Sequence, residues 1–129
     1  MSVQLHNPAD IAAPLGAYSH GVSGPGSGRW LHIAGQVGVH PDGSLADSIA
    51  GQAEAAWRNL VGVLADAGMT TGNLVKVNHY LLRCEHLQEY AAVRSRFLGD
   101  ARPASTLLIV QALARPEWLV EVDAIAWRA

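Results

Sequence analysis

The 129-residue sequence lacks the features that mark several common classes of protein. It has one cysteine, Cys84, which excludes an intrachain disulfide and a zinc site built on cysteine pairs. Its nine lysines and arginines form no run and the formal net charge is −2, so a basic patch that binds nucleic acid is not expected. No stretch of about 18 apolar residues occurs, and the N-terminus lacks the pattern of a secretory signal. We therefore expect a soluble, cytoplasmic protein that binds neither membranes nor nucleic acid.

Metal-binding spacings are absent as well. Six histidines are present, but none stands in an HxH, HxxxH or HExxH pattern, which are spacings that bring two imidazoles to one metal ion. We expect no metal site.

The composition describes one domain, residues 1–129, with a substantial hydrophobic core. Half of the residues are hydrophobic and 16% are charged, and the mean hydropathy is +0.13. So low a charged fraction suggests that some apolar surface is buried between subunits, which predicts a homo-oligomer.

Hydrophobic periodicity predicts an α+β fold with the order β-β-β-α-β-α-β-β, in which two helices cover one face of a single sheet. The glycine-rich turn Ser23–Gly28 predicts a hairpin between the second and third strands, and the last two strands are predicted to be adjacent. The predicted strands are Val3–His6, Ala17–Val22, Trp30–Val39, Leu74–Leu82, Thr106–Leu113 and Leu119–Trp127, and the predicted helices are Ile49–Ala67 and Glu85–Leu98.

The last predicted strand alternates between two faces. One face carries small apolar side chains, and the other carries two carboxylates beside large apolar ones: Leu119, Glu121, Asp123, Ile125 and Trp127. This second face either meets water or forms a polar site inside an assembly.

Several short segments together resemble the RidA/YjgF (reactive intermediate deaminase) family. In chain order they are Gly16-Ala17-Tyr18-Ser19, Ala34-Gly35-Gln36, Gln52 with Asn59-Leu60, Ala67-Gly68, Pro103-Ala104 and the segment from Val120 to Ala126. Each segment alone is weakly diagnostic, but their shared order along almost the whole chain is specific.

The resemblance implies a chorismate-mutase-like fold, a homotrimer, and clefts between subunits. Family members with deaminase activity hydrolyse reactive enamines and imines, such as 2-aminoacrylate, to keto acids and ammonia without a metal or cofactor. In those members an arginine after Pro-Ala binds the substrate carboxylate, a glutamate on the last strand positions water, and a tyrosine shapes the cleft.

Carried over onto this sequence, the resemblance implies Glu121 as the catalytic residue and Tyr18 and Gly35 as substrate contacts. Ser105 stands where the arginine is expected, and Arg94 stands where the second helix often has an asparagine. A serine offers one neutral hydrogen bond worth about 1 kcal/mol, against roughly 1.5–3 kcal/mol for a bond to a charged group. The usual amino-acid-derived imines are therefore not the expected substrates.

Other roles remain open for several of these candidate residues. Ser105 is a nucleophile only if a base lies beside it, and His79 and His32 are the candidate bases. Arg94 and Arg102 are candidates to replace the missing guanidinium from another direction, although either could instead be solvated or ion-paired.

Three functions are compatible with these features. The first is a Rid-type hydrolase that acts on a small imine or enamine. The second is a non-catalytic small-molecule binder or regulatory trimer that keeps the cleft without the chemistry. The third, ribonuclease activity, is discounted because no basic groove with interleaved aromatic residues is visible.

Overall fold

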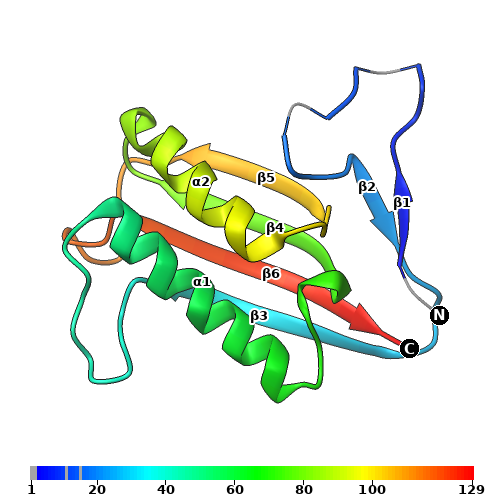
Figure 1. Ribbon diagram of the computed structural model, residues 1–129, viewed down its shortest axis with the longest axis horizontal. Coiled ribbons are helices and arrows are strands. Elements are labelled where there is room, and N and C mark those ends of the chain that lie inside the picture. The colour runs from blue at the N-terminus through cyan, green and yellow to red at the C-terminus, as the bar shows by residue number, and fades with distance from the viewer. Residues whose placement is uncertain (1–2, 11, 15) are drawn as a thin grey trace.

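The computed structural model describes residues 3–10, 12–14 and 16–129 (Figure 1). Within these ranges the strands and α-helices follow the predicted order, and two 3-10 helices, Thr71–Asn73 and Cys84–His86, are added. The strands are β1 Gln4–His6, β2 Gly21–Ser23, β3 Arg29–Val37, β4 Leu74–Leu81, β5 Ala104–Ile109 and β6 Val120–Arg128, and the helices are α1 Ile49–Asp66 and α2 Leu87–Leu98. None of the described helices is long and apolar enough to cross a membrane.

The main sheet has four strands in the order β3-β6-β4-β5. Strand β6 is antiparallel to both of its neighbours, whereas β4 and β5 are parallel. Both helices lie on the same face of this sheet (Figure 1), which confirms the predicted α+β arrangement. The opposite face, which we call the outer face, carries no helix.

The core lies between the two helices and the sheet. An apolar stripe along α1 is buried there, with Trp57, Leu60 and Leu64 fully inaccessible to solvent. The small apolar side chains of β6 face the helices, as the alternation predicted: Val120, Val122, Ala124 and Ala126 are buried. Burial of the α1 stripe against the sheet places α1 over β3 and β6, with α2 packed beside it.

The predicted hairpin between the second and third strands is wrong. Strand β2 pairs with β1 in a separate two-stranded sheet, and β3 pairs with β6 along nearly its whole length. The described residues therefore form two sheets rather than the single sheet that was predicted. A nine-residue strand gains more backbone hydrogen bonds from the nine-residue β6 than three-residue β2 could offer.

The last two strands are also not neighbours, because β4 lies between β5 and β6. Strand β5 begins at Ala104 and ends at Ile109, so residues 110–119 form the connection that crosses β4. Local sequence favours strands but does not specify which strand pairs with which.

Trp127 departs from the predicted alternation. Its outward-pointing side chain is only 1% exposed, because the turn between β2 and β3 folds over it. The indole Nε1 donates a hydrogen bond of 3.0 Å to the backbone oxygen of Ser27, and Gly24 and Gly28 lie against the ring.

Candidate functional site

Tyr18, Arg94 and Ser105 line one pocket at the edge of the main sheet, together with Gly16, Leu87 and Leu107. The segment before β2 runs alongside the start of β5, where the Ser19 amide donates to the Pro103 carbonyl at 2.8 Å. This contact brings Tyr18 next to Ser105, and α2 contributes Arg94 from above the sheet. Three segments that are distant in sequence thus converge on one small space.

Ser105 points toward the helix-bearing side of the sheet. It is paired in register with the buried Val77, and its Oγ lies 2.9 Å from Nε2 of His79. His79 is 1% exposed, and its Nδ1 is hydrogen-bonded to the hydroxyl of Tyr90. Trp57 Nε1 donates to the same hydroxyl at 3.2 Å.

Arg94 supplies the positive charge of this pocket. Within the described part of the chain its guanidinium makes no hydrogen bond or ion pair, and its Nε is buried. Burial, with the charges of Arg94 and Lys76, lowers the pKa of His79 to about 3, so its imidazole is neutral at neutral pH.

Glu121 lies on the outer face, in a hollow shared with Tyr80 and Asp123 and with the start of the β5–β6 connection. Burial raises the pKa of its carboxyl above the ordinary value, and the nearby charge of Asp123 raises it further. A carboxylate with a raised pKa is a stronger base at neutral pH than an ordinary glutamate.

Gly35 lies directly against Glu121. The register of β3 against β6 shifts between Ile33 and Gln36, and at this irregularity a Cβ on residue 35 would collide with the Glu121 carboxylate. Glycine is thus required for the observed position of Glu121.

Asp123 has a structural role. Its carboxylate accepts hydrogen bonds from the Asn78 amide at 2.8 Å and from the Tyr80 hydroxyl at 2.9 Å, both on the neighbouring strand. The bond to Asp123 raises the pKa of the Tyr80 hydroxyl, and burial and the charges of Asp123 and Glu121 raise it further.

The candidate residues therefore form two groups in one chain. Tyr18, Arg94 and Ser105 lie together at the sheet edge, whereas Gly35 and Glu121 lie together on the outer face. Among the residues that the structure describes, none lines both pockets.

Two other candidates lie elsewhere. The guanidinium of Arg102 donates to the Gly99 and Ala101 carbonyls at 2.8 Å each, so it closes the end of α2 and does not line the Ser105 pocket. His32 is exposed on β3 and is paired with Ile125, which places it far from Ser105 in the sheet order.

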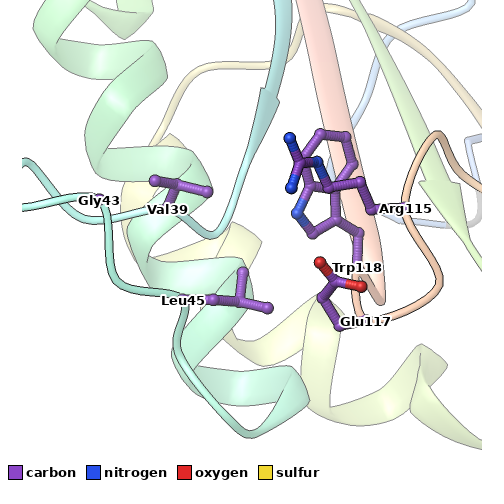
Figure 2. Close-up of a pocket in the computed structure, with 6 residues that line it drawn as sticks. All are labelled: Val39, Gly43, Leu45, Arg115, Glu117 and Trp118. Carbon is purple, nitrogen blue, oxygen red and sulfur yellow. The ribbon is translucent and has the colours of Figure 1, made fainter.

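A further pocket lies between the β3–α1 and β5–β6 connections (Figure 2), at the end of the main sheet away from the Ser105 pocket. Arg115 lies over the Trp118 ring at 5.7 Å, and Glu117 lies beside them. None of the residues predicted for the site lines this pocket. Across the described ranges, no group of three or more His, Cys, Asp or Glu side chains is placed to hold a metal ion.

Sequence reasoning missed Tyr90 and Trp57 as neighbours of the site. Both residues lie on the buried faces of helices, and their helical spacing gave no indication of their polar contacts. His79 was a candidate, but its two partners depend on the parallel pairing of β4 with β5.

The fold places this chain among α+β proteins in which two helices cover one face of a mixed sheet. The family described as Endoribonuclease L-PSP matches residues 9–128, and the chain belongs to this family, Ribonuc_L-PSP/RidA/YjgF. A RutC family protein of Pyrococcus abyssi is 27% identical over 117 residues, covering 89% of each chain. Protein HMF1 of Saccharomyces cerevisiae is 30% identical over 102 residues, covering 78% of this chain and 77% of HMF1.

Among solved structures, the Rid family protein YyfB of Yersinia pestis has a TM-score of 0.88 and 32% identity. The match covers 99% of this chain and 100% of that one. The predicted fold class is confirmed by this likeness.

Proposed function

We propose that this chain is a Rid-type hydrolase that deaminates a small imine or enamine bound among Tyr18, Arg94 and Ser105. The observation that carries the proposal is the convergence of these side chains on one pocket, where Arg94 has no partner among the described residues. A guanidinium with a buried, unsatisfied N–H gains hydrogen bonds when a ligand oxygen enters.

In this proposal Arg94 on α2 replaces the strand arginine of the family deaminases. Because the guanidinium approaches from the helix, an acid bound to it lies in a different orientation from one bound at position 105. We therefore infer that the substrate differs in shape from 2-aminoacrylate.

The chemistry needs a base that activates water. As water adds to the carbon of the C=N bond, Glu121 accepts a proton from the water and returns it to the nitrogen, which gives a carbinolamine. Glu121 then takes the hydroxyl proton of the carbinolamine and passes it to the nitrogen, so that the C–N bond breaks, ammonia leaves and a carbonyl remains. Its raised pKa suits this exchange.

The separation of Glu121 from Ser105 implies that the working site combines two copies of the chain. The outer face, which holds Glu121, also exposes the large apolar side chains of Trp30 and Leu108, which are 47% and 49% accessible. Covering this face with a second copy buries them and carries Glu121 to a neighbouring pocket. We propose the homotrimer that the family resemblance implies, in the cytoplasm and without a cofactor.

The experiment is a coupled assay with imines generated by an amino-acid oxidase from several amino acids. We expect Glu121→Gln to lower kcat by about 10²–10⁴-fold, because the amide cannot accept the proton. We expect Arg94→Met to raise KM by roughly 10–100-fold, because a hydrogen bond to a charged group is lost.

Arg96→Met is the matched control, since Arg96 is an exposed arginine on the same helix whose nearest carboxylate, Glu54, is 4.0 Å away. Arg96→Met should leave kcat and KM unchanged. Full turnover of every imine by Glu121→Gln, or none by the unmodified protein, would contradict the proposal.

The second candidate is a non-catalytic binder, favoured by the distance between the Glu121 and Ser105 groups in one chain. It predicts saturable ligand binding without turnover, so one imine converted above its background hydrolysis rate would exclude it. We do not propose ribonuclease activity, despite the family's description, because the net charge is −2.

A further inference from the structure

A buried chain of hydrogen bonds connects the core to the pocket. It runs from Trp57 on α1 to Tyr90 on α2, then to His79 on β4 and to Ser105 on β5. Trp57 and Tyr90 are 0% exposed and His79 is 1% exposed, so water does not compete for these groups. The chain ends at the one member that lines the pocket.

The donors and acceptors that these four side chains carry fix the direction in which each hydrogen bond is donated. Trp57 can only donate, so its N–H occupies a lone pair of the Tyr90 oxygen. The Tyr90 proton then needs an acceptor, and His79 Nδ1 is the one its hydroxyl contacts in the described structure. The opposite direction would leave a buried hydroxyl proton unpaired, at a cost of about 1–3 kcal/mol.

The tautomer of His79 follows from that direction. Since Nδ1 accepts from Tyr90 and the ring is neutral, its single proton is on Nε2. Nε2 therefore donates to the Ser105 oxygen at 2.9 Å.

We propose that Trp57, Tyr90 and His79 are positioning residues that hold Ser105 as a hydrogen-bond donor to the ligand. Because His79 occupies a lone pair of the Ser105 oxygen, the Ser105 proton is directed to the pocket. The ligand atom beside Ser105 is then an acceptor oxygen of a carbonyl or carboxylate, rather than an N–H group. His79 in this tautomer cannot take the Ser105 proton, so Ser105 is not an activated nucleophile.

Arg94 adds a second donor to the same pocket. Its buried Nε–H lacks a partner among the described residues, and two donors facing one space select an acceptor. The inference refines the proposed function by stating what the ligand presents to Ser105, and to that extent it rests on the function.

The direction of these hydrogen bonds can be tested without any ligand. Two-bond ¹H–¹⁵N correlation spectra of histidine-labelled protein report the tautomer of each imidazole, and the spectrum of His79→Asn identifies the His79 signals. We expect the proton on Nε2, and a proton on Nδ1 would overturn the proposal. Because no substrate is involved, this failure would leave the deaminase proposal standing, and an absence of turnover would leave the tautomer result standing.

A double-mutant cycle tests whether Tyr90 acts through Ser105. The probe is pyruvate, a carboxylate beside a carbonyl, with binding followed by amide shifts. We expect Ser105→Ala to weaken binding about 3–10-fold, Ser105→Thr to retain most of it, and Tyr90→Phe to weaken it in the same direction.

In the Ser105→Ala background, Tyr90→Phe should have no further effect on pyruvate affinity, although it destabilises the fold in both backgrounds. Independent, multiplying effects on affinity would overturn the positioning role. No saturable binding of pyruvate to the unmodified protein would overturn the acceptor-oxygen assignment.

Discussion

At the scale of single residues, His79 connects the stability of the core to the chemistry of the pocket. It is buried and neutral, and it accepts from Tyr90 while donating to Ser105. Burial, together with the charges of Arg94 on α2 and Lys76 on its own strand, disfavours protonation of the imidazole.

This environment predicts a specific dependence of stability on pH. The unfolded chain binds a proton at His79 near pH 6.5, whereas the folded chain binds it near pH 3, so the unfolded state holds more protons between these values. Stability is complete above about pH 6.5 and falls on acidification. Between pH 7 and pH 4.5 we expect His79 to account for a loss of about 2–3 kcal/mol in the free energy of unfolding.

Urea unfolding at several pH values measures this loss, and His79→Gln is the comparison because glutamine does not titrate. Its own stability will be lower, but its decline between pH 7 and pH 4.5 should be about 2–3 kcal/mol smaller. Identical declines in the two proteins would contradict the buried, neutral imidazole.

The sequence predicted polar residues that line a common pocket, but not how they are connected. Tyr18, Arg94 and Ser105 were predicted as substrate contacts and line one pocket, whereas their role in the site stays a prediction. The role of Gln52 was not predicted. Its buried amide binds the Ala46 and Glu117 carbonyls and the Leu119 amide, partners that only tertiary structure brings together.

At the scale of elements, the helices were predicted almost to the residue. Helix α1 begins at Ile49 as expected, where the Ser48 side chain accepts from the Gly51 amide. Helix signals are local, since capping and the 3.6-residue apolar period lie within the element itself. Strand pairing is non-local, which explains why the hairpin and the adjacency of the last two strands were wrong.

The connection between β2 and β3 has a structural function that its turn-like sequence did not reveal. Gly28 has φ +113°, and a Cβ there would lie 2.6 Å from the Arg128 carbonyl and 2.7 Å from the Trp127 ring nitrogen. This close approach lets the connection cover Trp127 and shields the end of β6.

We therefore expect Gly28→Ala to destabilise the protein by about 1–3 kcal/mol. Gly26→Ala, two residues earlier, is the matched control because nothing lies within 4 Å of its added Cβ. It should change stability by no more than about 0.5 kcal/mol. Thermal or urea unfolding measures both, and equal stabilities for the two variants would show that the connection does not hold Trp127.

At the scale of the whole molecule, the two faces of the main sheet carry different sets of side chains. The helix-bearing face holds the core and the buried chain that ends at Ser105. The outer face carries Glu121 beside exposed apolar side chains, including Trp30 and Leu108. In our proposal, an assembly of copies of this chain covers the second face and completes the site. The sequence could not predict which candidate residues share a pocket, because the strand order decides which residues lie on the outer face of the sheet and which lie at its edge.

The most direct test of the proposed site is to co-refold equal amounts of two impaired variants, Glu121→Gln and Arg94→Met, and to assay the mixture at a substrate concentration well below the KM of the unmodified protein, where both variants turn over slowly. If each site combines Glu121 of one copy with Arg94 of another, a mixture of hybrid trimers contains intact sites, and activity should recover to about a quarter of the unmodified level for random assembly. Light scattering should give a trimer mass throughout. Hybrid trimers no more active than their parents at that substrate concentration, or a monomer mass for the unmodified protein, would contradict a site shared between subunits.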